Sequence, residues 1–412
     1  MSFSQALSGL NAQQQKLGAV GNNIANSQTV GFKSSNVQFA DVYAESRIGL
    51  GVRTASVLQN FSQGNVESTN RNMDLAISGE GFFRFQQPNG EVGYSRNGQL
   101  TMTADGRLVN AQGAQIMGYA ANAAGTVQAG GDVEALTVEA GDLAASATTD
   151  LEVSLNLDAG EPEMVAPLEA DILAGLDAED YSYSTNATIY DSQGNARNLT
   201  FYFTKIDAAQ NEWEVSLRMT GGPEDAGTYA VENFARLDFD ASGRLEAGGQ
   251  ETFTFNAGEF NGTQLENLEV DVDFAGSSQS ANNSTVNDIV QNGYTAGSMV
   301  GVTIQNDGTV MRNYSNEQSR AAGQIALVSF RNPEGLKPEG DNLWTATADS
   351  GQELVGAAGT GLRGMIESSA VETSNVDMAR ELVDMIVAQR AYQANSQTIS
   401  TQDELLQTII NL

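Results

Sequence analysis

The sequence contains neither cysteine nor histidine among its 412 residues. These absences exclude the usual Ser-His-Asp and Cys-His catalytic arrangements and metal sites with histidine ligands. A hydrolase needs only two carboxylates, but the 52 acidic residues make chance pairs common, and none lies in a recognisable motif. The stretch GTGLRG at 359–364 matches a dinucleotide-binding pattern in letters only. We therefore expect no enzyme activity, no cofactor and no metal site.

Long apolar runs and targeting signals are also missing. No stretch approaches the roughly 18 apolar residues that cross a bilayer, so no membrane insertion is expected. The N-terminus lacks the basic region, apolar region and cleavage site of a secretory signal, as in a soluble cytoplasmic protein. The absence of cysteine fits the cytoplasm, and it equally suits a chain threaded unfolded into an oxidising exterior.

Basic residues are few, with 20 Lys and Arg against 52 Asp and Glu, which gives a net charge of −32. From Asp132 to Asp288 there are 31 acidic and 5 basic residues, a net charge of −26, so most of the excess lies in the middle of the chain. Such a field argues against nucleic acid or an anionic membrane as a partner. Aromatic residues make up only 7% and glycine reaches 43 residues, a composition typical of many short strands and turns.

At the N-terminus, residues recur in steps of four and three, the spacing of a coiled-coil seam. The positions are Phe3, Leu7, Leu10, Gln14, Leu17, Gly21 and Ile24. Ser2 and Gln5 have the spacing of a capping box, which predicts a helix over residues 1–27. Three interior glycines each cost about 1 kcal/mol relative to alanine, so this helix should not be stable alone.

The C-terminus supplies a partner helix, expected over residues 374–412. Ser374 and Asp377 have N-cap spacing, and neither proline nor glycine follows them. The seam positions here are Met378, Leu382, Met385, Tyr392, Ile399, Leu406 and Ile410. On pattern alone, two such stripes are most typical of a soluble dimerisation coiled coil.

Between the helices the sequence predicts β structure. Asn97-Gly98 and Asp105-Gly106 are strong hairpin signals within 93–119, and the stretches 234–249 and 300–316 repeat the pattern. The stretch YDSQGNAR at 190–197 superficially resembles a calcium loop but lacks the alternating ligands and the closing glutamate. We interpret it as a hairpin turn on a solvated face.

Two terminal stretches carry a resemblance to a family. ALSGLNAQQQKLGAVGNNIANSQTVGFKSS at the start and SNVDMARELVDMIVAQRAYQANSQTISTQDELL at the end resemble the axial rod and hook proteins of the bacterial flagellum. NVQFADVYAES, ISGEGFFRFQQPNGEVGYSRNGQL and GDNLWTATADSG point to the hook members of this family. The resemblance is specific over 1–119 and 290–412. In the acidic centre of the chain, the resemblance rests on the place of this segment between the two matching parts and on the stretch YDSQGNA.

The resemblance implies a structural homo-oligomer whose copies stack helically into a short curved tube. Such a tube is a universal joint that transmits torque from rod to filament and encloses the export channel. The implied partners are the flagellar rod, the hook cap, the hook–filament junction proteins and the export apparatus. The implied location is the extracellular hook, reached without a cleaved signal peptide. In this scheme the apolar stripes are assembly seams, and Asn26 and Gly31 form the helix exit, because glycine readily takes positive φ.

The expected fold is mainly β, with two nested β domains and terminal helices that form a coiled-coil inner layer. A connecting region spans 28–71 and 360–373, a discontinuous inner β domain spans 72–147 and 290–359, and an acidic outer β domain spans 148–289. A distal rod protein, a secreted β-rich adhesin and an acidic hydrolase are the alternatives. An adhesin would need an aromatic-lined pocket and a conventional export signal, neither of which is evident.

Overall fold

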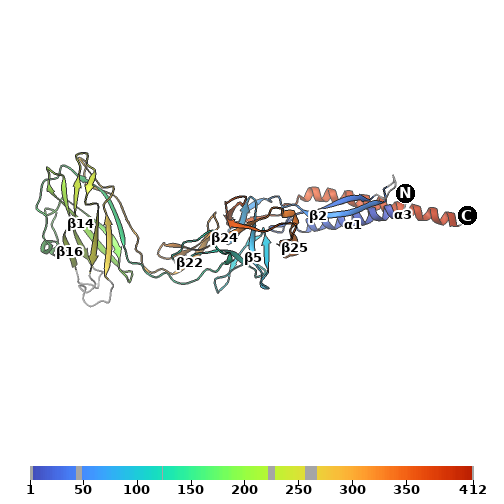
Figure 1. Ribbon diagram of the computed structural model, residues 1–412, viewed down its shortest axis with the longest axis horizontal. Coiled ribbons are helices and arrows are strands. Elements are labelled where there is room, and N and C mark those ends of the chain that lie inside the picture. Colours follow the sequence, from blue (N-terminus) through green and yellow to red (C-terminus); the bar gives the residue numbers. More distant parts are fainter. Residues whose placement is uncertain (1–2, 43–48, 123, 221–227, 256–266, 411–412) are drawn as a thin grey trace. The chain divides into compact units, whose positions relative to one another are not determined.

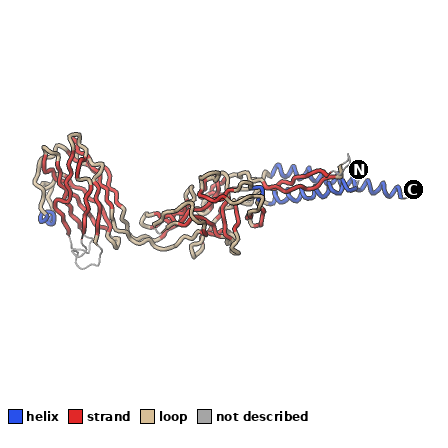
Figure 2. The backbone as a smooth tube through the Cα atoms, viewed as in Figure 1, coloured by secondary structure: helices blue, strands red, loops and turns tan. Residues whose placement is uncertain are grey.

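The computed structural model describes residues 3–42, 49–122, 124–220, 228–255 and 267–410. The chain forms two compact units. Unit 1 comprises Met1–Ala140, Val300–Asn313 and Ser319–Leu412, and unit 2 comprises Gly141–Met299 and Tyr314–Gln318. Strands predominate in both units, and the two long helices belong to the chain ends, which confirms the predicted mainly β class (Figure 2).

Helices α1 (Phe3–Ala25) and α3 (Met378–Ile410) of unit 1 run antiparallel and side by side (Figure 1). The expected capping residue Ser2 lies outside the described residues. At α3 the cap is Asp377, whose Oδ1 accepts the backbone N–H groups of Ala379 at 3.0 Å and Arg380 at 3.2 Å. The cap therefore lies three residues beyond the predicted one at Ser374, and the helix begins at Met378.

A two-stranded hairpin packs along α1, where the sequence had predicted only a connecting region. It consists of β1 (Ser35–Val42) and β2 (Gly51–Gln59), which pair antiparallel. Ser8 Oγ of the helix accepts the Val52 N–H at 3.2 Å. The Asn23 amide exchanges two hydrogen bonds of 2.9 Å with the backbone of Ser35. Polar side chains of α1 thus replace a sheet partner for the hairpin.

The main sheet of unit 1 interleaves strands from two distant parts of the chain. Antiparallel pairing of β10 with β24 joins them. The order is β22 (Met299–Ile304), β23 (Thr309–Tyr314), β24 (Ser319–Ser329), β10 (Gln115–Ala120), β5 (Phe82–Gln86), β6 (Val92–Ser95), β26 (Leu343–Thr345) and β25 (Lys337–Gly340), with β8 (Thr101–Met102), β9 (Leu108–Val109), β11 (Glu134–Ala135) and β27 (Leu354–Ala357) beside it. Smaller sheets pair β28 (Met365–Ser368) with β4 (Asp74–Ser78) and β7 (Gly98–Gln99), and β29 (Ala370–Glu372) with β3 (Val66–Ser68).

The two hairpin signals in this unit had different outcomes. Asp105-Gly106 does form the turn between β8 and β9, which confirms that prediction. The prediction for Asn97-Gly98 was wrong, because Gly98 lies in β7 and pairs with β4. A Cβ at Gly98 would lie 2.3 Å from the Leu75 carbonyl oxygen, so the glycine serves close strand approach and not a tight turn.

Unit 2 is a sandwich of two five-stranded sheets. One contains β18 (Gln250–Phe255), β19 (Leu268–Asp273), β12 (Asp150–Asp158), β20 (Ser278–Ser280) and β21 (Thr285–Gln291). The other has the order β13 (Tyr183–Tyr190), β14 (Ala196–Asp207), β15 (Glu212–Thr220), β16 (Thr228–Phe239) and β17 (Leu245–Ala247). Leu151, Val153 and Leu155 of β12 enter one shared core with Trp213 and Phe274.

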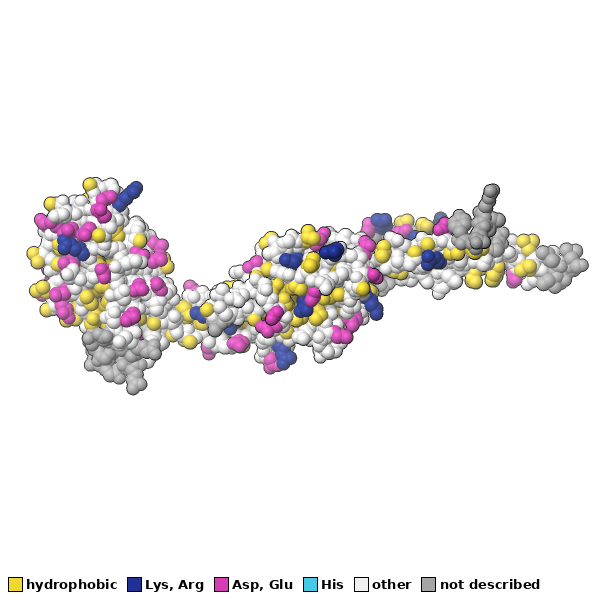
Figure 3. Space-filling model, viewed as in Figure 1, with side chains coloured by type: hydrophobic (Ala, Val, Ile, Leu, Met, Phe, Trp, Pro, Cys, Tyr) yellow, Lys and Arg dark blue, Asp and Glu magenta, His cyan; other side chains and the backbone are white. Residues whose placement is uncertain are grey.

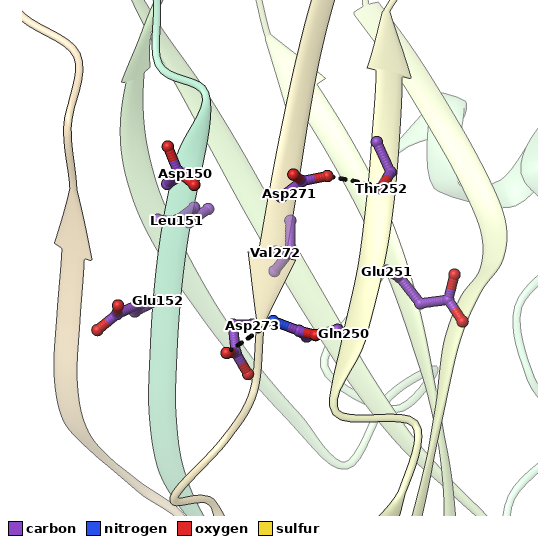
Figure 4. A pocket seen from close by; sticks show the side chains of 9 residues that line it. All are labelled: Asp150, Leu151, Glu152, Gln250, Glu251, Thr252, Asp271, Val272 and Asp273. Carbon is purple, nitrogen blue, oxygen red and sulfur yellow. Dashed lines mark hydrogen bonds between the residues drawn. The ribbon is translucent and has the colours of Figure 1, made fainter.

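Alternation along these strands reconciles an acidic surface with an apolar core. The outward residues between the inward ones of β12, β18 and β19 include Asp150, Glu152, Asp271 and Asp273 (Figure 4). Asp271 accepts the Thr252 hydroxyl at 2.7 Å, and Asp273 accepts the Gln250 amide at 3.2 Å. Asp271 and Asp273 are thus engaged with polar neighbours on the adjacent strand.

The turn at 190–197 joins β13 to β14 as a hairpin, as predicted, and Gln193, Asn195 and Ala196 at its tip are exposed. Asp191 is buried, and its Oδ2 accepts Arg197 Nη2 at 2.8 Å. Its Oδ1 accepts the backbone N–H groups of Gln193 and Asn195. These bonds outweigh desolvation and lower the pKa of Asp191. Both carboxylate oxygens therefore serve the turn itself.

A buried ionic cluster joins four segments of unit 1. Lys33 Nζ lies 2.6 Å from Glu372 Oε1 and donates to the Ser62 carbonyl at 2.7 Å. The same carboxylate accepts the Gly64 N–H at 2.8 Å and lies 3.4 Å from Arg96 Nε. The side chains of Lys33 and Glu372 are 0% exposed. Burial and the Arg96 guanidinium lower the pKa of Lys33, although the Glu372 carboxylate opposes them.

Removal of the central carboxylate should destabilise unit 1 strongly. Glu372→Gln leaves the Lys33 and Arg96 charges buried without compensation, so we expect a loss of about 3–5 kcal/mol in the free energy of unfolding. The chain has two tryptophans, Trp213 in unit 2 and Trp344 in unit 1. In a Trp213→Phe background, urea unfolding followed by the fluorescence of Trp344 measures unit 1. The exposed Glu367 gives the control Glu367→Gln, and equal losses in both variants would contradict the expectation.

Candidate assembly surface

The contact between α1 and α3 within the chain includes small and polar residues at three points. A Cβ at Gly9 would lie 2.9 Å from Asn395 Nδ2, so the helices approach closely there. Further along, Lys16 Nζ lies 3.6 Å from Asp384 Oδ1, and Asn23 Nδ2 donates to Glu381 Oε1 at 3.1 Å. Close approach and polar side chains therefore contribute to this contact.

The predicted seam of α1 is only partly buried within the chain. Phe3 and Leu7 remain exposed, at 53% and 44%, and Leu10, Leu17 and Ile24 are half-buried. The buried residues of α1 are instead Ala6, Ala12, Val20 and Asn23. Since a step of one residue turns a helix by about 100°, the buried positions and the predicted stripe face different neighbours.

The predicted seam of α3 is also largely uncovered. Met378, Leu382, Tyr392 and Leu406 are exposed, whereas Met385 and Ile399 are half-buried. Ile410 ends the helix, but its side chain lies outside the described residues. The residue of α3 that becomes fully buried is Ala388, which the seam pattern did not include.

Sequence reasoning missed four further exposed apolar residues of α3. Val383, Ile386, Val387 and Leu405 are exposed by 51–61%. Adjacent apolar pairs such as Leu382-Val383 could have indicated these residues. Neighbouring residues point about 100° apart on a helix, so an adjacent pair places apolar side chains on two faces. The exposed apolar residues therefore lie on more than one side of the helix. On the face in view, Figure 3 shows apolar side chains along the helical part of unit 1.

These exposed stripes favour association of copies. Burying one Val, Leu, Ile or Met side chain contributes about 1.5–3 kcal/mol. Association costs an estimated 4–15 kcal/mol in lost freedom, so covering several of these side chains is sufficient to drive it. Within the described residues, no helix combines the length and apolarity that a bilayer crossing requires.

The predicted helix exit has a defined geometry. Asn26 continues the α1 hydrogen-bond pattern through its N–H to the Asn22 carbonyl at 3.1 Å, and its Oδ1 accepts the Thr29 hydroxyl at 3.1 Å. Gly31 has a φ of 71°, and its N–H donates to the Glu372 carbonyl at 2.7 Å. The chain thus turns between Asn26 and Gly31 and reaches the buried ionic cluster at Lys33.

Glycines at the exit and within α1 should respond oppositely to alanine. At Gly31 a Cβ would lie 2.6 Å from the backbone nitrogen of Asn97 in a positive-φ conformation, so Gly31→Ala should cost about 1–3 kcal/mol. At Gly18 a Cβ meets nothing within 4 Å, so Gly18→Ala should stabilise α1 by about 1 kcal/mol. Urea unfolding followed by Trp344 fluorescence tests the first, and helical circular dichroism tests the second. An unchanged free energy of unfolding in the Gly31→Ala variant would contradict this account of the exit.

The helix contact should also strengthen in acid. Desolvation raises the pKa of Glu381 above 4.5, and Asp384 adds to the shift, although the Asn23 hydrogen bond opposes it. Ionisation of Glu381 therefore opposes helix pairing, so the contribution of Glu381 is fully present below pH 4.5 and is lost as pH rises through its raised pKa. Glu381→Gln should slow amide exchange in α1 at pH 7, and this advantage should disappear toward pH 4.5. Glu404→Gln, at an exposed site on the same helix, should change nothing.

Four family models match successive parts of the chain. They are described as flagella basal body rod protein over 4–33, flagellar hook protein FlgE/F/G D1 domain over 76–154, flagellar basal body protein FlaE D2 domain over 156–294, and flagellar basal body rod FlgEFG protein C-terminal over 367–412. Together they include both helices that carry the exposed stripes.

Curated relatives match over their whole length. The chain is 44% identical to flagellar hook protein FlgE of Salmonella typhimurium and 43% identical to that of Escherichia coli, with 100% of each chain covered. It is 33% identical to the protein of Borreliella burgdorferi, over 100% of this chain and 99% of the relative. A crystal structure of Helicobacter pylori FlgE2 covers 74% of this chain and 100% of its own, with a TM-score of 0.54 at 15% identity, and supports the fold. The chain belongs to the family of flagellar hook proteins.

Proposed function

We propose that this chain is a structural subunit of the flagellar hook and polymerises through the exposed apolar stripes of α1 and α3. The observation that carries the proposal is the division of surfaces on these helices. Their mutual contact includes small and polar residues at Gly9 and Lys16, whereas Leu7, Leu382 and Val387 are about half exposed on a folded unit. Copies that pack side by side would bury these stripes in a continuous helical layer.

In this proposal the helices form the inner layer of a short curved tube, with Asn26 and Gly31 as the exit to the β domains. The acidic domain at 148–289 stays at the outer surface, because the net charge of −26 between Asp132 and Asp288 disfavours crowding near the axis. The tube transmits torque from rod to filament as a universal joint and encloses the export channel. Its further partners are the rod, the hook cap, the hook–filament junction proteins and the export apparatus.

The alternatives receive no comparable support. The terminal segments match rod models, but the full-length relatives named above are hook proteins. Location in the extracellular hook, reached through the flagellar export channel without a cleaved signal peptide, follows from this proposal. It is consistent with a chain that contains no cysteine to form stray disulfides during export.

A charge on either stripe should abolish tubes and leave the subunit folded. Leu7 and Leu382 are 44% and 46% exposed, so Leu7→Asp and Leu382→Asp keep their carboxylates in water in the monomer. In a polymer that buries these positions, an unpaired carboxylate costs several kcal/mol. Electron microscopy should show no tubes, and thermal unfolding should match the parent chain.

Asn11→Asp is the matched control, since Asn11 is an exposed polar residue of the same helix. It introduces the same charge without removing an apolar side chain, and its tubes should persist. Normal tubes from both Leu7→Asp and Leu382→Asp would remove the stripes from the assembly mechanism.

A further inference from the structure

Unit 2 carries an open groove on the segment 164–180, lined by apolar and acidic side chains. The short helix α2 (Glu169–Ala174) anchors the segment through Ile172, which is fully buried against Tyr202 and Ala230. The groove has a volume of about 640 Å³ and is lined on its apolar side by Met164, Val165, Leu168 and Leu176. The buried Ile172 thus anchors a segment whose apolar side chains are open to solvent.

Two apolar side chains of this segment are largely open to solvent. Val165 is 90% exposed and Leu168 is 65% exposed. Asp171, Glu179 and Asp180 also line the groove. Residues 161–180 contain seven acidic residues and no basic one. An occupant must therefore offer apolar side chains together with positive charge, and a second groove of the same kind would be repelled.

The chain itself offers such a surface in unit 1, at the stretch GTGLRG that no catalytic interpretation explained. Leu362 is 72% exposed, and Leu354 and Met365 are each 49% exposed. Between them, Arg363 donates to the Leu354 carbonyl at 3.2 Å, the Ala357 carbonyl at 3.3 Å and the Thr360 hydroxyl at 2.7 Å. These partners are neutral.

The backbone and hydrogen bonds of the loop at 359–365 fix the positions of Leu362 and Arg363. Gly359 and Gly361 have φ values of 72° and 64°, a conformation that glycine adopts without strain. The three hydrogen bonds fix the Arg363 guanidinium on the loop, and none of the carboxylates in the described residues forms an ion pair with it. An apolar side chain and an unneutralised cation thus lie next to each other on a preformed turn.

We propose that the groove at 164–180 of one copy receives the loop at 359–365 of a second copy within the polymer. The inference rests on the proposed function, because only polymerisation brings copies together at a fixed spacing. Leu362 enters the apolar groove, and Arg363 faces the acidic residues of the segment. The contact joins two different surfaces, so each copy has one groove and one loop to offer.

The absence of cysteine allows a direct test by cross-linking. Leu168→Cys and Leu362→Cys are made in separate chains, which are mixed, polymerised and oxidised. A disulfide requires Cα atoms within about 7 Å, so only a contact between copies can link the two variants. We expect a covalent dimer of twice the 43.5 kDa chain, in several-fold higher yield than from either variant alone. The control pair Leu168→Cys with Met102→Cys places the second thiol at another exposed apolar site of unit 1.

The outcomes separate this inference from the proposed function. Tubes that form without a dimer above the control pair would overturn the inference and leave the hook function intact. Absence of tubes from the parent chain would overturn both. Dimers of equal yield in unpolymerised mixtures would also overturn the inference, because they would show collision and not a polymer contact.

Leu362 also provides a matched pair of charge variants that needs no thiol. Leu362→Glu and Leu362→Lys remove the same apolar side chain from an exposed position, but they bring opposite charges toward the acidic groove. Tubes of Leu362→Glu should dissociate under milder conditions of heat or denaturant at low salt than tubes of Leu362→Lys. High salt should reduce the difference, because it screens charges beyond a few ångströms. Equal stability of the two tubes at low salt would overturn the proposed contact.

Discussion

The buried ion pair of Lys33 and Glu372 is the interaction on which the arrangement of unit 1 depends. It joins the segment after α1 to the segment before α3, and Arg96 ties both to the β structure. Buried charges stabilise a fold weakly on balance, but they penalise every arrangement that separates them. The cluster therefore fixes the direction in which both helices leave the β domain. A subunit that must repeat identically along a polymer needs this constraint more than added stability.

In the two helices, the residues that set their register differ from the apolar residues that can stabilise association. Gly9, Lys16 and Asn23 set the register of α1 against α3 through close approach and polar bonds. Such a contact contributes little free energy, since exposed or partly exposed ion pairs are weak. The larger apolar side chains remain available to other copies. Under the proposed function, helix pairing and polymerisation are coupled, because neighbouring copies would cover the exposed apolar side chains of both helices.

The sequence allowed prediction where a signal is local. The heptad positions of Leu7 and Leu382 and the turn at Asp105-Gly106 follow from short-range spacing. The sequence did not reveal the contact between Gly9 and Asn395. A pattern of apolar residues indicates which face of a helix is buried, but it does not indicate which element covers that face. The contact of Lys33 with Glu372 spans 339 residues, so no window of the sequence contains it. The role of Gly98 depends on a neighbouring strand in the same way.

The acidic unit imposes a further constraint on how copies can meet. In β12, the buried residues Leu151 and Val153 alternate with Asp150 and Glu152, so the apolar side chains form the core while the acidic side chains stay on the surface. Two such surfaces repel, so a symmetric contact between them is disfavoured. A groove that accepts a cationic loop creates a heterologous contact instead. A symmetric contact ends in a dimer, whereas a heterologous contact whose rotation does not close continues as an open helix. The sign of the charge in the centre of the chain thus favours growth of a helical polymer over closed pairs.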